Sequence, residues 1–119
     1  NSGHWSQAGS PTSQFENHLR AVLDLPLGLA CNTGGEAAVS AMINIIGCDD
    51  HQMALLSVPG VHFHWYGKSV RQKRKMGHIN VTASGYAELG SKLQKLSEYL
   101  SLAHFPCLAD EASRLTSVS

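Results

Sequence analysis

The stretch from Val61 to Val81, VHFHWYGKSVRQKRKMGHINV, decides the fold of this chain. Its first six residues alternate cleanly, which predicts a strand with one face toward a core. The core face then carries Val61, Phe63 and Trp65, and the outward face carries His62, His64 and Tyr66. Residues 74–81 alternate too, with Arg74, Met76, His78 and Asn80 on one side and Lys75, Gly77, Ile79 and Val81 on the other. The stretch therefore predicts two neighbouring antiparallel strands joined by a basic connection.

Helices and one more strand are expected on either side of this hairpin. Thr12 or Ser13 can cap a helix whose apolar residues recur every three or four positions, namely Phe15, Leu19, Val22 and Leu23. Residues 37–46 favour a buried strand, although residues 37–42 alone also suit a helix. A short helix is expected at 49–56 and a longer one from Ser84 to Leu100, and Pro106 ends the expected ordered part. The predicted architecture is α+β.

The cations are concentrated in the hairpin. Five of the nine, Lys68, Arg71, Lys73, Arg74 and Lys75, fall within eight residues, and no Asp or Glu occurs between Asp50 and Glu88. Because the net charge is zero, this segregation creates a local positive potential that the overall balance conceals. A mixed Arg and Lys cluster suits phosphate, whereas the simpler interpretation is a solvated turn that keeps a hairpin soluble.

Composition excludes several classes of protein. Hydrophobic residues make up 43% of the 119 residues and charged residues 15%, so the chain is not a disordered charged tail. The apolar stretches are too short to cross a membrane. The N-terminus lacks the pattern of a signal peptide, which indicates a chain cut from something longer. The three cysteines are widely spaced and form no CxxC pair, so neither a disulfide framework nor a zinc site is expected. Three reduced cysteines are the usual state in a cytosolic protein.

Histidine is plentiful and offers weaker signals. His62 and His64 can share a strand face, but no nearby carboxylate or cysteine completes a metal site. His78 is expected on the same face as Arg74, where it can touch a ligand directly. The segment Asn1 to His4 can wrap donors around an anion, yet the chain has no GxxxxGK[ST] or GxGxxG motif.

Six blocks of sequence resemble one enzyme family in their order. They are NSGHW at 1–5, TSQFENHLRA at 12–21, LPLG at 25–28, MINIIG at 42–47, HFHWYGK at 62–68 and RQKRKMGHIN at 71–80. The chain resembles the C-terminal portion of N5-carboxyaminoimidazole ribonucleotide synthetases, the ATP-grasp subunits of phosphoribosylaminoimidazole carboxylase in purine biosynthesis. The resemblance implies an ATP-dependent ligase that joins bicarbonate to 5-aminoimidazole ribonucleotide with the help of Mg²⁺. It also implies a cytoplasmic homodimer with no membrane or nucleic-acid partner.

The same resemblance assigns site residues. Asn1 and Ser2 match a segment that surrounds the ribonucleotide and the carboxylating centre, so they are expected to be catalytic. Lys68 and Arg74 match residues that bind the ribonucleotide phosphate. Lys75 and His78 occupy adjacent positions, Lys75 as a further phosphate ligand and His78 as a candidate substrate contact. Charge pattern and resemblance therefore indicate the same hairpin.

The resemblance further divides the chain into parts. Residues 1–25 are expected to end an ATP-grasp domain, residues 26–102 to form a small β-rich module resembling a rudimentary barrel-sandwich, and residues 103–119 to be a tail or linker. Many relatives have Pro-Gly where this chain has Gln72-Lys73. The carboxylates for Mg²⁺ and the lysines for ATP are not found in this chain, so no ATP, Mg²⁺ or other metal is expected to bind it alone. Without the missing N-terminal part, the fragment is expected to have no ligase activity.

Two other classes of function remain open from the sequence. The basic loop and the pair Trp65-Tyr66 suit a small nucleic-acid-binding module, for which one short loop offers few phosphate contacts. Alternatively, the patch docks on an acidic partner in an assembly. The sequence also leaves open whether a mutase domain follows Ser119.

Overall fold

The computed structural model describes residues 3–31, 37–49, 53–100 and 104–117. In chain order, the elements are α1 (Ser6–Gly9), α2 (Gln14–Val22), β1 (Val39–Ile46), the 3-10 helix η1 (Met53–Ser57), β2 (Val61–Trp65), β3 (Lys75–Ala83), α3 (Tyr86–Ser97) and α4 (Leu108–Thr116). The α+β architecture is confirmed. Within the described residues, no helix has the length and apolar character needed to cross a membrane.

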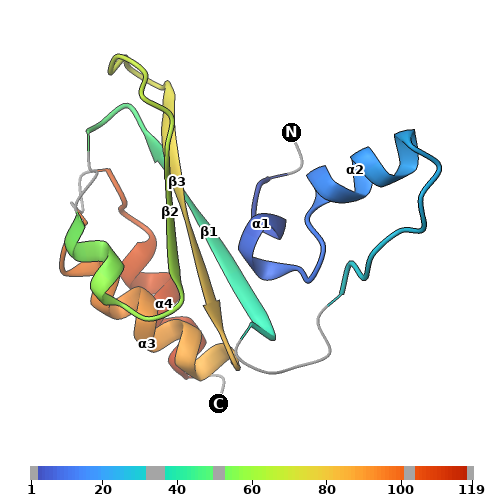
Figure 1. Cartoon of the computed structure of the whole chain (residues 1–119). Helices are drawn as coiled ribbons and strands as arrows, with labels where there is room; N and C mark the ends of the chain where they lie inside the picture. Colours follow the sequence, from blue (N-terminus) through green and yellow to red (C-terminus); the bar gives the residue numbers. More distant parts are fainter. Residues whose placement is uncertain (1–2, 32–36, 50–52, 101–103, 118–119) are drawn as a thin grey trace.

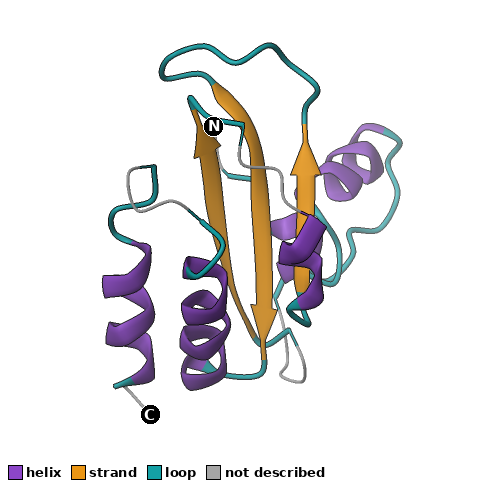
Figure 2. Ribbon diagram, turned by 90° about the vertical axis from the view of Figure 1, so that its left-hand side faces the viewer, coloured by secondary structure: helices purple, strands orange, loops and turns teal. Residues whose placement is uncertain are grey.

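The three strands form one antiparallel sheet in the order β1-β3-β2 (Figures 1 and 2). The predicted hairpin is present, with Val61 opposite Val81 and Trp65 opposite Gly77. β1 occupies the other edge of β3, where Val39 pairs with Ala83 and Ile43 with Ile79. The strand prediction for residues 37–46 is confirmed, and β3, the central strand, is buried along most of its length.

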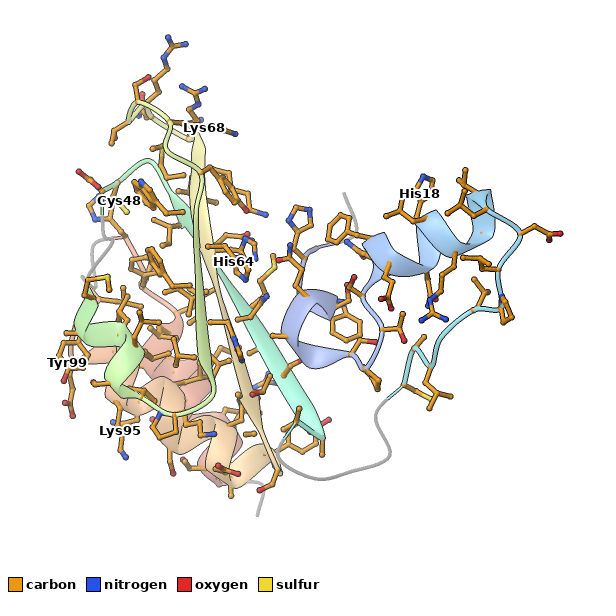
Figure 3. The ribbon with its side chains drawn as sticks, in the orientation of Figure 1. His18, Cys48, His64, Lys68, Lys95 and Tyr99 are labelled. Carbon is orange, nitrogen blue, oxygen red and sulfur yellow. The ribbon has the colours of Figure 1, made fainter. Side chains whose placement is uncertain are left out.

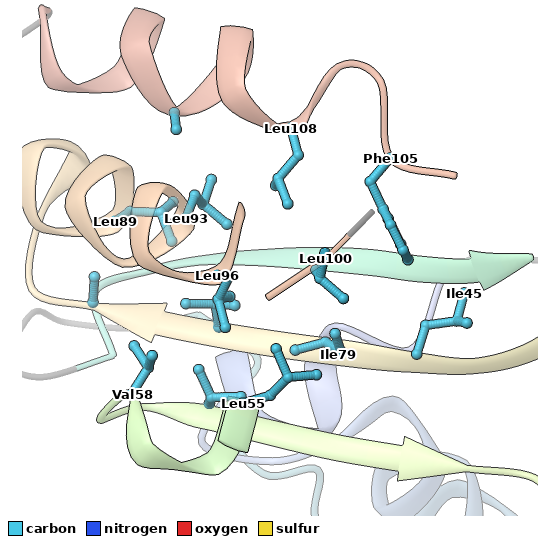
Figure 4. Close-up of a cluster of buried hydrophobic side chains, with 14 of the residues drawn as sticks. Ile45, Leu55, Val58, Ile79, Leu89, Leu93, Leu96, Leu100, Phe105 and Leu108 are labelled. Atoms are coloured by element: carbon cyan, nitrogen blue, oxygen red, sulfur yellow. The ribbon is translucent and has the colours of Figure 1, made fainter. Parts of the chain in front are cut away.

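One face of the sheet carries the hydrophobic core. α3 lays Leu89, Leu93 and Leu96 onto this face, where they meet Ile79 and other buried apolar side chains (Figure 4). The helix buries these residues because they recur at three- and four-residue spacing along one stripe. Phe63 and Trp65 are partly buried against the same core, as their alternation predicted.

The C-terminal segment corrects the sequence analysis, which expected a tail or linker over 103–119. The structure has α4 there, packed beside α3, with Leu108 and Ala112 buried (Figure 1). Leu115 also packs against the core, so the apolar positions 108, 112 and 115 form the stripe that anchors the helix. The close fit to α3 depends on Gly90, since a Cβ there would lie 2.8 Å from the Thr116 nitrogen.

The opposite face of the sheet is covered by the N-terminal segment. α1 lies against β3 and β1 on the side away from α3 and α4 (Figure 1). This approach requires Gly9, because a Cβ at that position would lie 2.8 Å from the Ser40 Cβ. On the side of the sheet covered by α1, His78 and Asn80 of β3 are buried.

α2 projects away from the sheet (Figures 1 and 2). Its predicted start is confirmed, since the Ser13 hydroxyl accepts a hydrogen bond from the Glu16 amide at 3.1 Å. Its apolar stripe is exposed: Phe15, Leu19, Val22 and Leu23 are each at least 42% accessible.

Candidate functional site

A cluster of rings and amides fills the space between β3 and the N-terminal segment. We call it the His78 cluster, and it consists of His4, Gln7, His64, Tyr66, His78 and Asn80. His78 and Asn80 point from β3 toward α1 because they alternate with Ile79 and Val81, which face the core. Figure 3 shows His64 on this side of the sheet, facing α1.

His78 is the centre of the cluster. Its Nδ1 lies 2.6 Å from the Tyr66 hydroxyl, and its Nε2 lies 3.0 Å from Oε1 of Gln7. Its ring stacks on His64, with centroids 4.4 Å apart, and meets the edge of His4 at 5.4 Å. The pKa of His78 is lowered to about 4, and burial is the largest cause. The nearby His64, Lys75 and His4 contribute to the same shift. The ring is therefore neutral at physiological pH.

The cluster also fastens the start of the described chain to the sheet. The Asn80 amide donates to the His4 carbonyl at 3.1 Å, and the Gln14 amide donates to the Gly3 carbonyl at 2.9 Å. The His4 amide contacts the Met42 sulfur at 3.1 Å. Asn1 and Ser2, the expected catalytic residues, lie outside the described residues. What the structure does establish is that the chain immediately after them is held on the polar face of β3.

The basic loop joins β2 to β3 and begins directly beyond this cluster. Tyr66 follows the last residue of β2, and the Lys68 ammonium lies 5.2 Å from the centre of the Tyr66 ring. Arg74 folds back onto the same loop, where its Nη1 donates to the carbonyl and the hydroxyl of Ser69 at 3.2 and 3.3 Å. Lys68 lies near the far end of the sheet, whereas Lys95 lies on the α3 side (Figure 3).

A β-bulge changes which side chains of β3 share a face with His78. The register shifts between Ile45 and Ile46, so Met76 is an extra residue on β3, and it is fully buried in the core cluster. The prediction that Met76 shares a face with His78 is therefore wrong. Lys75 was predicted opposite His78, yet its ammonium is close enough to lower the pKa of that histidine. An alternating pattern cannot reveal a bulge, because the inserted residue resets the alternation.

The sequence analysis missed Gln7 and the anchoring role of Asn80. Gln7 lies 71 positions from His78 in the sequence, so no local pattern links them. Asn80 carried a visible signal, since a polar residue between Ile79 and Val81 marks a face that needs a hydrogen-bond partner. Its Oδ1 is buried without a partner among the described atoms.

Metal ligands do not gather in this part of the molecule. No group of three His, Cys, Asp or Glu side chains that could hold an ion occurs among the described residues.

Comparison with known proteins connects this arrangement to an enzyme family. Residues 40–92 match the family described as phosphoribosylaminoimidazole carboxylase C-terminal domain. The N5-carboxyaminoimidazole ribonucleotide synthase of Vibrio cholerae is 51% identical over 108 residues, covering 91% of this chain and 28% of that protein. This chain matches the C-terminal part of the N5-carboxyaminoimidazole ribonucleotide synthases.

Solved structures of the synthases share the fold. The enzyme from Thermus thermophilus has a TM-score of 0.74 and 50% identity, over 84% of this chain and 27% of that chain. An Aspergillus clavatus synthase, solved in complex with ADP and 5-aminoimidazole ribonucleotide, has a TM-score of 0.65 and 37% identity, over 83% of this chain and 28% of that chain. The chain therefore spans less than a third of the length of each of these synthases.

Proposed function

We propose that this chain is the C-terminal part of an ATP-dependent ligase that carboxylates 5-aminoimidazole ribonucleotide with bicarbonate. The observation that carries this proposal is the 51% identity to the Vibrio cholerae synthase over 91% of the chain. The Aspergillus clavatus relative was solved with 5-aminoimidazole ribonucleotide, which supports that molecule as the substrate.

Within this proposal, the basic loop binds the phosphate of the ribonucleotide. Lys68, Arg74 and Lys75 supply the cations, and Arg74 adds a planar guanidinium that can form paired hydrogen bonds to phosphate oxygens. His78 contributes a neutral ring at the base of the loop, next to Lys75. Asn1 and Ser2 complete the site from the N-terminal segment, which Asn80 and Gln14 hold against the sheet.

The proposal also assigns the parts of the chain. Residues 1–25 are the end of the ATP-grasp domain, and residues 26–102 are a small module of barrel-sandwich type. The packing of α1 on β3 is consistent with a site at the junction of the two parts. ATP and Mg²⁺ act in the remainder of the enzyme, which is a cytoplasmic homodimer.

The geometry does not favour the nucleic-acid alternative. Trp65 is partly buried against the core, and Tyr66 is engaged by His78 and Lys68. Both rings are thus already engaged within the chain, which counts against a platform for stacking on bases.

The test is made in a complete synthase. The matching segment of the Vibrio cholerae enzyme is replaced by residues 1–119 of this chain. The affinity of this chimeric synthase for 5-aminoimidazole ribonucleotide is then measured by titration. We expect Arg74→Ala to weaken binding about 10- to 100-fold, because charge-assisted hydrogen bonds contribute roughly 1.5–3 kcal/mol. The affinity for the ribonucleoside, which lacks the phosphate, should not change.

Lys95→Ala is the matched control, since it removes an exposed cation from α3. Unchanged affinity of Arg74→Ala for the ribonucleotide would contradict the assignment of the phosphate site. A chimeric synthase that folds but does not carboxylate 5-aminoimidazole ribonucleotide would contradict the proposed function as a whole.

A further inference from the structure

Three side chains connect α1 to the basic loop through an unbroken series of contacts. Gln7 lies 3.0 Å from Nε2 of His78, Nδ1 of His78 lies 2.6 Å from the Tyr66 hydroxyl, and the Tyr66 ring lies 5.2 Å from the Lys68 ammonium. The series begins on the N-terminal segment and ends at an expected phosphate ligand. None of the first three residues is needed to form the hydrophobic core.

The direction of each hydrogen bond follows from the chemistry of the groups. The Gln7 carbonyl oxygen only accepts, so the Nε2 of His78 must carry the proton. The Nδ1 of the neutral ring is then an acceptor, and the Tyr66 hydroxyl donates to it. A single tautomer therefore satisfies both partners. His64, stacked on the ring at 4.4 Å, restricts its rotation further.

Lys68 needs such support because its own side chain is flexible. It lies in an exposed loop, and a lysine carries a strongly hydrated ammonium on a flexible four-carbon stem. The face of the Tyr66 ring attracts that ammonium, but only a fixed ring gives it a fixed direction. The hydrogen bond to His78 fixes the ring, since His78 is 1% exposed and held on both sides.

We propose that Gln7, His78 and Tyr66 are positioning residues that orient the Lys68 ammonium toward the phosphate of the bound ribonucleotide. This inference rests on the proposed function, which makes Lys68 a phosphate ligand. It gives Gln7, His78 and Tyr66 a role that acts through Lys68, and it makes the N-terminal segment part of the phosphate site. The site is thereby complete only when α1 lies on the sheet.

A double-mutant cycle in the synthase carrying residues 1–119 tests the inference. Lys68→Ala should raise the KM for 5-aminoimidazole ribonucleotide by at least about tenfold, and Tyr66→Phe should raise it about three- to tenfold. The double variant should equal Lys68→Ala alone, because the tyrosine hydroxyl acts through the lysine. Tyr86→Phe, at an exposed tyrosine on α3, is the control and should match the parent enzyme.

The outcomes separate the two levels of the argument. If Lys68→Ala leaves the KM unchanged, the phosphate assignment itself fails. If Lys68→Ala raises the KM but Tyr66→Phe has no effect, the positioning role is wrong. It is also wrong if Tyr66→Phe raises the KM by the same factor in the Lys68→Ala background as in the parent enzyme. Gln7→Leu should raise the KM about two- to fivefold, because it removes the acceptor for Nε2 of His78.

A spectroscopic measurement on the 119-residue chain checks the inference without activity. The ring nitrogen chemical shifts of His78 should report a neutral ring protonated on Nε2 at about pH 7.5. Tyr66→Phe should shift the Nδ1 signal and leave the ring neutral. A ring protonated on Nδ1 would overturn the proposed direction of the hydrogen bonds.

Discussion

Lys73 has a left-handed backbone, with a φ of +60°, in a turn closed by the Arg74 amide and the Arg71 carbonyl at 3.1 Å. A positive φ at the third position of a turn favours glycine, and proline suits the position before it. Gln72-Lys73 occupies those two positions, so a Pro-Gly pair would suit this turn. The chain has an additional cation here at the expense of an unfavourable backbone conformation.

We predict that Lys73→Gly stabilises the chain by about 0.5–1 kcal/mol relative to Lys73→Ala. Both variants remove the same charge, but only glycine adopts the left-handed conformation without a steric penalty. The measurement is the free energy of unfolding in urea, followed by tryptophan fluorescence. Equal stability of the two variants would argue against strain at this position.

Protonation of His78 gives a second prediction for single residues. Its pKa is about 4 in the folded chain and about 6.5 when unfolded, so the unfolded state binds the proton more tightly. The free energy of unfolding is then unaffected above about pH 6.5 and falls by up to about 3 kcal/mol as the pH drops from 6.5 to 4. His64, Lys75 and His4 face the ring and oppose its charge, and the pKa of His64 is itself lowered by burial.

Urea unfolding of the chain between about pH 7.5 and 4 measures this slope. His78→Phe keeps a buried ring but cannot take up a proton, so its stability should depend less on pH across this range. His18→Phe, at an exposed position on α2, should retain the full slope. The same slope in all three proteins would contradict the role of His78.

At the scale of elements, Gly90 is the point of closest approach between α3 and the backbone of α4. A Cβ on Gly90 would lie 2.8 Å from the Thr116 nitrogen and 2.9 Å from the Ala112 carbonyl oxygen, both of which are backbone atoms. Such atoms cannot move aside without displacing α4. The helix therefore depends on the absence of a side chain at this position.

We predict that Gly90→Ala lowers the free energy of unfolding by about 1–3 kcal/mol, the usual range for overpacking. The same change in a free helix would be stabilising by about 1 kcal/mol, so the expected sign is reversed here. Circular dichroism during urea unfolding measures the difference. Ser91→Ala, the exposed neighbour on α3, is the control, and a stabilising Gly90→Ala would show that α4 is not packed as described.

The whole molecule is less compact than its length allows. Its radius of gyration is 15.3 Å, whereas a compact domain of this length has about 13.5 Å. α2 and the segment after it account for this, because they project from the sheet (Figure 1). They also expose apolar side chains. The exposed residues are Phe15, Leu19, Val22, Leu23, Leu25, Leu27 and Leu29.

An apolar surface of this kind promotes association in water. We predict that the isolated 119-residue chain self-associates and that the double variant Leu19→Lys with Val22→Lys weakens the association at least about tenfold. Sedimentation velocity over a range of concentrations measures it. The control is Met53→Lys with Tyr86→Lys, two exposed apolar positions elsewhere, and an equal effect of this pair would show that α2 is not the contact surface.

The secondary structure of this protein was largely determined by local sequence. The alternation at 61–65, the capped stripe that begins at Ser13 and the leucine spacing of α3 each specify an element, because periodicity and capping act within a few residues. The concentration of cations in one loop was visible for the same reason. α4 was visible in principle through Leu108, Ala112 and Leu115, although no side chain caps its start.

Tertiary structure decided everything that depends on distant residues. The bulge at Met76 resets the alternation of β3 and places Met76 in the core, and it arises from pairing with β1, some thirty positions earlier in the chain. The link from Gln7 to His78 exists only because Gly9 lets α1 approach the sheet. Local sequence therefore specified the elements and the basic loop. Packing between distant segments selected the face on which His78 lies, its hydrogen-bond partners and its protonation state.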